Sequence, residues 1–280
     1  MDSARAALRP LGWCDDRTAA DVGRRARLEL TFGRRGDRTV LLHSYAEPPY
    51  RVGRVLPEGS GIHLIFASSA PGIFGGDGLT QTVVVESGAR VRITSQSAMQ
   101  VHPNKTGDVA TLVSTYRVED GGHLACEWDP LIPFADAHLE QRIAIEMKPG
   151  ASLFWSDALM AGREARGERW RFSQLFHELR LVRNGLLAYM ERYNIVPDAC
   201  ALEKRWTVGS ACYFGTVLAV GAAATRESAE RTYRELAAIG GLRASADLLE
   251  EHCLLARIVA PSGTSFREAR ESVRTSVLMR

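Results

Sequence analysis

Cysteine and long apolar segments are scarce in this sequence, and each shortage excludes a class of protein. The five cysteines among 280 residues are widely separated and form no Cys-x-x-Cys pair, so they indicate reduced thiols rather than a disulfide framework. The longest apolar stretch, residues 213–224, is shorter than the roughly 20 residues that a membrane-spanning helix needs. Charged residues interrupt the first 18 positions, where a secretory signal would need its apolar segment. We therefore expect a cytoplasmic protein without a membrane anchor.

Blocks of one charge sign are also missing. The formal net charge is +2, and the basic residues, only three of which are lysines, are scattered along the chain. Since no basic run or stripe could follow a phosphate backbone, nucleic-acid binding is not expected. The hydrophobic content of 45% is that of an ordinary globular protein, and a chain of this length can bury a large core without disulfides or metal.

Nucleotide-binding motifs are absent as well. The glycine-rich residues 71–78 fit neither the G-x-G-x-x-G nor the G-x-x-x-x-G-K-[ST] pattern. A strand-like segment, residues 82–86, follows them instead of a helix whose N-terminus could hold a phosphate. The pattern therefore favours a tight turn in which glycine supplies positive φ angles, and we expect no binding of ATP or GTP by this chain alone.

No pattern typical of a metalloenzyme or a hydrolase is present. The seven histidines form no H-x-x-x-H or H-E-x-x-H pair, and the closest His/Cys couple is His123 with Cys126 in a strand-like segment. A dedicated zinc site needs three or four ligands, usually with local spacing. Ser97 does not lie in a nucleophile elbow, and Cys126 has no neighbouring cation to activate its thiol. The chain is therefore not expected to be an enzyme.

Period-two hydrophobic patterns dominate the first three quarters of the chain and predict short strands. The predicted strands are residues 26–32, 82–86, 89–95, 110–118, 122–128 and 138–147. Asn184 and Gly185, between residues 179–182 and 186–189, give the strongest hairpin signal because both turn positions need positive φ. The short spacing between strands favours antiparallel pairing, since parallel strands need long crossovers.

The last quarter has a different pattern. Residues 226–239 have apolar side chains at helical spacing and stop at a pair of glycines. Residues 246–251 are predicted as a second short helix, residues 253–260 as a buried strand and residues 264–279 as a terminal helix. Ser262 and Thr264 are the candidate N-caps of the terminal helix. The simplest organisation is one domain over residues 1–280, β-rich from about 20 to 220 and helical from about 225 to 280.

Five segments resemble, in the same order, the signatures of the UreD family of urease accessory proteins, also called UreH. Residues 51–58, 72–79, 94–100, 128–134 and 162–168 carry the resemblance, and the closing Ala256-Arg257, followed by a short terminal helix, also comes in the expected order. The most specific is Gly-Arg-Glu-Ala-Arg-Gly-Glu at 162–168, and the similarity spans nearly the whole chain. This sequence departs from the family pattern at Ser69 and Ala70, where paired prolines are usual, and at Gln100 and His102, where lysine and tyrosine are usual.

The resemblance implies a fold and a function. The implied fold is mainly β, an extended β-helix-like stack of short strands with two to three helices toward the C-terminus. The implied role is a non-catalytic scaffold that binds UreF, which recruits the GTPase UreG, in a dimeric heterocomplex that docks on apo-urease. Nickel would pass through an internal water-filled tunnel, so only transient Ni²⁺ and no tightly bound cofactor is expected. The alternatives are a β-rich interaction module unrelated to nickel and, third, a hydrolase.

Two carboxylates within these signatures, Asp77 and Glu168, are the candidate stations on a nickel path. Carboxylates and waters bind nickel more weakly than imidazole and thiolate do, which suits reversible passage. A structural role is the alternative for both, with Asp77 capping its own turn and Glu168 pairing with Arg163. The remaining signature residues, expected to shape the turns, are Gly75, Gly76 and Gly167. The C-terminal helices and residues 213–220 are expected to contribute to the UreF contact through exposed apolar surface.

Overall fold

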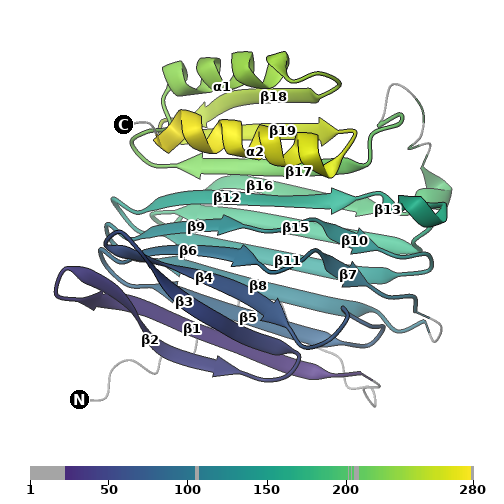
Figure 1. The fold of residues 1–280 in the computed structure, drawn as a ribbon, viewed down its shortest axis with the longest axis horizontal. Helices are drawn as coiled ribbons and strands as arrows, with labels where there is room; N and C mark the ends of the chain where they lie inside the picture. The colour runs from purple at the N-terminus through teal and green to yellow at the C-terminus, as the bar shows by residue number, and fades with distance from the viewer. Residues whose placement is uncertain (1–22, 105–106, 201, 203, 205–207, 279–280) are drawn as a thin grey trace.

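Consecutive strands of the chain cross back and forth between two facing β-sheets (Figure 1). The computed structural model describes residues 23–104, 107–200, 202, 204 and 208–278. The seven-stranded sheet consists, in spatial order, of β16 (Leu186–Ile195), β15 (Gln174–Arg183), β11 (His138–Met147), β8 (Ala110–Val118), β5 (Gly78–Val85), β1 (Arg25–Arg35) and β2 (Arg38–Ala46).

The second sheet has ten strands and two helices on its outer face. Its main order is β18 (Arg243–Glu250), β19 (Cys253–Ala260), β17 (Tyr213–Val220), β12 (Ser152–Met160), β9 (His123–Glu127), β6 (Arg90–Ser95), β4 (Gly61–Ser68) and β3 (Tyr50–Glu58). Two short strands, β7 (Met99–Val101) and β10 (Leu131–Pro133), pair beside β12. The helices are α1 (Arg226–Ala238) and α2 (Gly263–Leu278).

The centre of each sheet is parallel, which makes the prediction of antiparallel pairing wrong for the core. From β4 to β15 the chain alternates between the sheets, so β5, β8, β11 and β15 run parallel in one sheet and β4, β6, β9 and β12 in the other. Each crossover to a parallel neighbour is itself a strand of the facing sheet, and no long helix is needed. Antiparallel pairs close the two ends of the stack, for example β1 with β2 and β15 with β16. The expected β-helix-like stack is confirmed.

Interior side chains stack in columns, one residue per coil. Leu30, Val83, Tyr116, Ile145 and Leu181 are register partners across neighbouring strands of the seven-stranded sheet. All five are buried. Because side chains alternate between the two faces of a strand, every second residue of these segments enters the space between the sheets. This is the physical source of the period-two pattern in the sequence.

The hairpin predicted at Asn184 and Gly185 is confirmed. It joins β15 to β16, and the two residues have φ angles of 52° and 82°. The strand predicted at 253–260 is also confirmed as β19. The helix predicted at 246–251 is wrong, since these residues belong mostly to the edge strand β18. Ala246 and Leu248 pack toward the helices while Asp247 stays exposed, which is alternation of period two rather than helical spacing.

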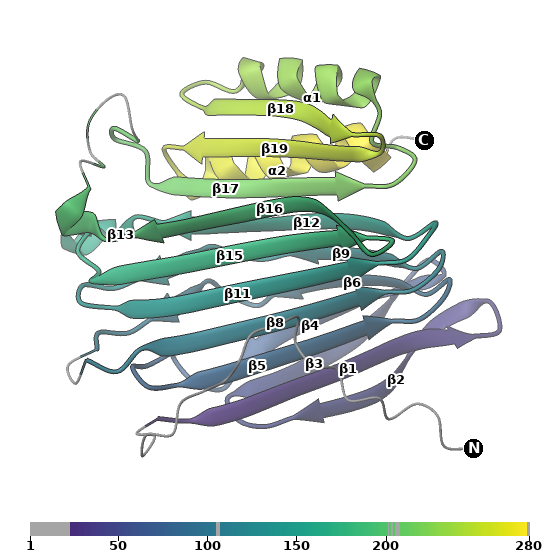
Figure 2. The same ribbon diagram turned by 180° about the vertical axis from the view of Figure 1, so that it is seen from behind.

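Two helices are present in the described chain, near the C-terminus as expected, and lie on the outer face of β17, β19 and β18 (Figures 1 and 2). Thr225 and Ser228 form a capping box at the start of α1. At the start of α2 the Ser262 hydroxyl accepts a hydrogen bond from the Ser265 N–H at 3.1 Å, so Ser262 rather than Thr264 is the cap. Neither helix is long and apolar enough to cross a membrane.

Candidate functional site

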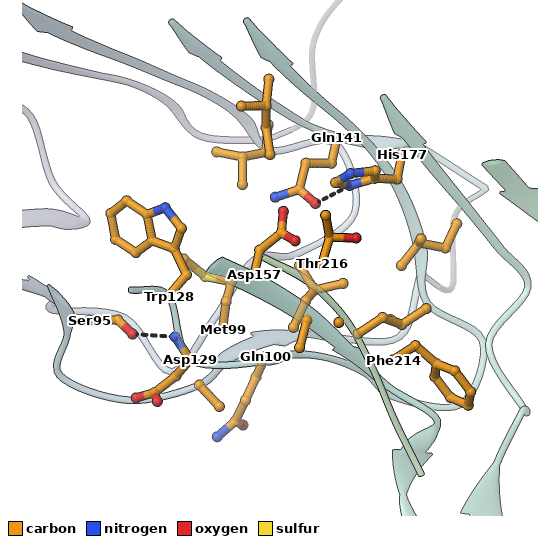
Figure 3. A pocket seen from close by; sticks show the side chains of 18 of the residues that line it. Ser95, Met99, Gln100, Trp128, Asp129, Gln141, Asp157, His177, Phe214 and Thr216 are labelled. Atoms are coloured by element: carbon orange, nitrogen blue, oxygen red, sulfur yellow. Dashed lines mark hydrogen bonds between the residues drawn. The ribbon is translucent and has the colours of Figure 1, made fainter. Parts of the chain in front are cut away.

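A cavity of about 530 Å³ lies between the two sheets (Figure 3). Strands β5, β8, β11, β15 and β16 contribute to one wall, and β4, β6, β12, β17 and β19 contribute to the other, with the segment around β7 at one end. Most of the lining is apolar. Polar and ionisable side chains enter it at inward-facing positions where the alternation of each strand would otherwise place an apolar residue.

Two rows of polar residues face each other across this cavity. On one wall Asp157 of β12 is the register partner of Thr216 on β17, which in turn pairs with Arg257 on β19. On the other wall Gln141 and His177 are register partners on β11 and β15. Figure 3 shows Asp157 lying close to Gln141, His177 and Thr216. The fold thus brings together residues that are more than 100 positions apart in the chain.

Asp157 is the most perturbed of the acidic residues in the cavity. Its Oδ2 atom is fully buried and has no hydrogen-bond partner among the described residues. Burial in this apolar setting, followed by the negative charge of Glu191, raises the pKa of the Asp157 carboxyl to about 7. The group therefore exchanges its proton near neutral pH, and a cation that binds there would favour the ionised form.

Imidazole and carboxylate groups also line the cavity at His177 and Glu191. The His177 ring is 3% exposed, its Nδ1 lies 3.0 Å from Gln141 Oε1, and it stacks on Tyr193. Burial lowers the pKa of His177 to about 4, so the ring is neutral at pH 7. With Nδ1–H donating to Gln141, the Nε2 lone pair is left to accept a hydrogen bond or bind a metal ion.

Glu191 is buried and held by three neighbours. Its Oε2 accepts hydrogen bonds from the hydroxyls of Thr216 at 2.9 Å and Tyr189 at 3.1 Å. Its Oε1 forms an ion pair with Arg257. Across the described residues there is no group of three or more His, Cys, Asp or Glu side chains that could hold a metal ion. The cavity therefore offers separate ligands rather than a closed metal centre.

These cavity residues were missed by sequence reasoning, although a signal for them exists. Asp157 alternates with Trp155 and Leu159 on the buried face of its strand, and Gln141 lies on the same face as Leu139. A polar residue on the apolar face of a period-two strand must either be satisfied in the interior or face a cavity. That rule selects both positions without any motif.

Asp77 lies away from the cavity, in the turn before β5. It is 2% exposed, pairs with Arg24, and accepts hydrogen bonds from the backbone N–H groups of Phe74 and Arg24, each at 2.9 Å. Burial opposes ionisation of Asp77, but the hydrogen bonds and the charge of Arg24 outweigh it and lower its pKa. These contacts are those expected of the structural alternative, in which Asp77 caps its own turn.

Glu168 also lies outside the cavity, in the small hairpin formed by β13 (Gly162–Arg163) and β14 (Glu168–Arg169). It pairs with Arg163 and accepts a hydrogen bond from the Ala135 N–H at 3.2 Å. The hydrogen bond from Arg163 holds the pKa of Glu168 below its usual range. Gly167 ends the intervening 3-10 turn with a φ of 70°. A role of either carboxylate in nickel passage stays a prediction.

A chain of aromatic and cationic side chains joins the Asp77 and Glu168 turns. Arg24 lies over Phe74, which stacks on His102 with 4.2 Å between ring centroids. His102 meets Phe134 edge-on, and the guanidinium of Arg163 lies over the Phe134 ring, 3.8 Å from its centroid. Each contact of this kind is worth about 0.5–1.5 kcal/mol. The signature segments that contain Asp77 and Glu168 are therefore packed together.

Glycines allow the Asp77 turn to form. Gly76 has a φ of 80°, and a Cβ added to Gly75 would lie 2.6 Å from the side chain of Asn104. Gly76 supplies a left-handed backbone conformation, and Gly75 permits the close approach of the backbone to Asn104. The expectation of a tight turn at residues 71–78, rather than a phosphate-binding loop before a helix, agrees with this geometry.

Two facing sheets wound as a β-helix, with a largely apolar cavity between them that a few polar side chains enter, define a β-helical protein with an internal cavity. The chain belongs to the UreD family: the family model described as UreD urease accessory protein matches residues 24–280. The resemblance found in the sequence is thereby confirmed.

Individual relatives agree with this membership. A urease accessory protein UreD of Cupriavidus pinatubonensis is 31% identical over 84% of this chain and 82% of its own length. One from Acetivibrio thermocellus is 29% identical over 65% of this chain and 70% of its own length. One from Lysinibacillus sphaericus is 37% identical over 51% of this chain, and there the matched part spans about half of the relative, 54%.

Proposed function

We propose that this chain takes part in urease maturation as a non-catalytic scaffold that, with UreF and the GTPase UreG, delivers nickel to apo-urease. Nickel passes through the cavity between the two sheets. The observation that carries this proposal is the row of separate oxygen and nitrogen ligands in the cavity: Asp157, His177 and Glu191. Family membership supports the connection to urease.

The ligand chemistry of the cavity suits transfer better than storage. Ni²⁺ accepts both imidazole nitrogen and carboxylate oxygen, and its affinity rises with the number of strong ligands in one place. The described residues contain no cluster of three such ligands. Conduction requires sites that favour entry and still permit exit, and single ligands spaced along an apolar cavity meet that requirement.

Exposed apolar side chains near the helical end are the proposed partner surface. Leu186 is 76% exposed, Leu187 58% and Met190 46%, all on the edge strand β16, and Tyr233 on α1 is 51% exposed. Residues 213–220, which were also expected to contribute to the UreF contact, offer little exposed apolar surface. This segment is β17, which lies between β12 and β19 under the helices and is mostly buried. We therefore place the contact at α1 and β16.

Narrowing the cavity tests the passage directly. Met99 lines the cavity and is half-buried, so Met99→Trp would fill part of the space at a cost in stability of about 1–3 kcal/mol. We expect the complex with UreF and UreG to form in normal yield, while the nickel content of urease falls to the level reached without this chain. Complex yield and nickel content are measured in the same preparation of a reconstituted activation assay.

Leu42→Trp is the matched control, because Leu42 is exposed on the edge strand β2 at the other end of the stack. It is expected to load urease normally. Normal nickel loading by Met99→Trp would show that metal does not use this cavity, and the chain would then act on urease only as a scaffold.

A further inference from the structure

Arg257 occupies the boundary between the cavity and solvent. It is one of the residues that line the cavity, yet its side chain is 47% exposed. Its guanidinium forms an ion pair with the buried Glu191 and donates a hydrogen bond to Thr216 at 3.1 Å. A residue that both lines a cavity and reaches solvent marks an end of that cavity. Arg257 therefore holds a positive charge on the carboxylate at that end.

We propose that Arg257 is a displaceable cation: it neutralises Glu191 while the cavity is empty and moves toward solvent when a divalent metal ion takes its place. This inference rests on the proposed function and names a control element of the same path. Its basis is the juxtaposition of a half-exposed guanidinium with a buried carboxylate at the end of the cavity.

Repulsion between positive charges explains why Arg257 must leave Glu191 when a divalent ion binds there. A guanidinium and a divalent ion on the same carboxylate repel each other, and the repulsion is strong where water is scarce. The guanidinium is always charged, so it cannot relieve the repulsion by losing a proton. Its exposed portion gives it a route outward, whereas Glu191 is fixed by Thr216 and Tyr189. Exchange of the two cations keeps the carboxylate paired at each stage.

Such an exchange would also prevent the cavity from trapping metal. Glu191 and Asp157 are close enough for the charge of one to raise the pKa of the other. Without a competing cation the combined negative charge of the two carboxylates would hold a divalent ion more tightly. The tethered guanidinium returns when the ion moves on, which weakens binding and speeds release. The cavity would therefore let the metal ion pass rather than store it.

The test uses the full chain and nickel sulfate alone. Arg257→Gln keeps donors for Glu191 and Thr216 but removes the charge, and it should bind Ni²⁺ about tenfold more tightly than wild type in equilibrium dialysis and release it more slowly. Arg257→Lys restores a positive charge and should bind as wild type does. Arg117→Gln is the control, since Arg117 pairs with Glu146 on the outer face of the seven-stranded sheet.

Wild-type protein provides an independent measurement that does not depend on the folding of a variant. Nickel should raise the labelling of Arg257 by phenylglyoxal, read by mass spectrometry, and leave that of Arg117 unchanged. Equal nickel affinity in Arg257→Gln and wild type, or labelling of Arg257 that nickel does not change, would overturn the proposal. If Glu191→Gln still weakens nickel binding in that case, the cavity remains the nickel path and only the exchange is lost. If Glu191→Gln also has no effect, the path itself is wrong.

Discussion

Compared with the wild type, the Asp157→Asn variant is expected to become more stable as the pH rises from 5 to 8. It is also expected to transfer less nickel to urease. The reason is the cost of an ionised carboxylate at this buried position, where one oxygen has no hydrogen-bond partner among the described residues. Asparagine has nearly the same size and carries no proton to lose. It removes the cost and, with it, the charge that attracts a cation.

The sign of the pH dependence follows from the raised pKa. The ordinary pKa of an aspartic acid is 3.8, and that of folded Asp157 is about 7. Between these values the folded state holds a proton that the unfolded state releases, so the contribution of Asp157 to the stability of the wild type is greatest at low pH and falls until about pH 7. Between pH 5 and pH 8 the free energy of unfolding of Asp157→Asn should therefore rise by roughly 3 kcal/mol relative to that of the wild type.

Denaturant titrations of both proteins at several pH values measure this difference. His177 and His123 have pKa values lowered to about 4 by burial, and both give the opposite slope, but they are common to the two proteins and cancel. Asp120→Asn, at an exposed turn, is the matched control for the substitution itself. A constant difference for Asp157→Asn would mean that Asp157 is ionised throughout this range and that the apolar environment does not control it.

Local signals in the sequence predicted individual strands and turns well, but they predicted poorly how the strands pair. The Asn184–Gly185 turn fixes its own backbone angles, so the hairpin could be read from two residues. The parallel core could not be read in this way, because a strand's neighbour lies one full coil away and the intervening strand belongs to the other sheet. Family signatures supplied the β-helix because they refer to the whole chain rather than to neighbouring residues.

The composition of the cavity, like the pairing of the strands, could not be predicted from local sequence alone. The alternation in β12 places Asp157 on the buried face, but only the winding of the chain places it opposite His177. Glu191 and Arg257 are 66 positions apart and belong to different sheets. Asp77 and Glu168 were selected because they lie in signature segments, and signature segments include residues that hold turns together. Asp157, Gln141 and His177 lie outside the signature segments, although residues of the signatures 94–100 and 128–134 also line the cavity.

Asp77→Asn is expected to destabilise the fold, with complex yield and urease activation lost together. Asp77 is 2% exposed and its two oxygens accept four hydrogen bonds, two from the guanidinium of Arg24 and two from backbone N–H groups. An amide has one oxygen to accept them and turns its NH₂ group toward the donors of Arg24. Since Arg24 is partly solvated, the loss should be near the lower end for a buried pair, about 2–3 kcal/mol.

Glu168→Gln is the comparison that distinguishes a structural role of these carboxylates from a role in nickel transport. Glu168 has a similar arginine partner and a single backbone donor, but its side chain is 20% exposed, so water can replace part of what is lost. We expect it to fold and to join the complex, and a drop in the nickel content of urease in that intact complex would support its predicted role as a nickel station. If Asp77→Asn instead keeps normal thermal stability and complex yield while nickel loading falls, its four hydrogen bonds are dispensable. Asp77 would then act on the metal, and the path would extend beyond the cavity to the turn before β5.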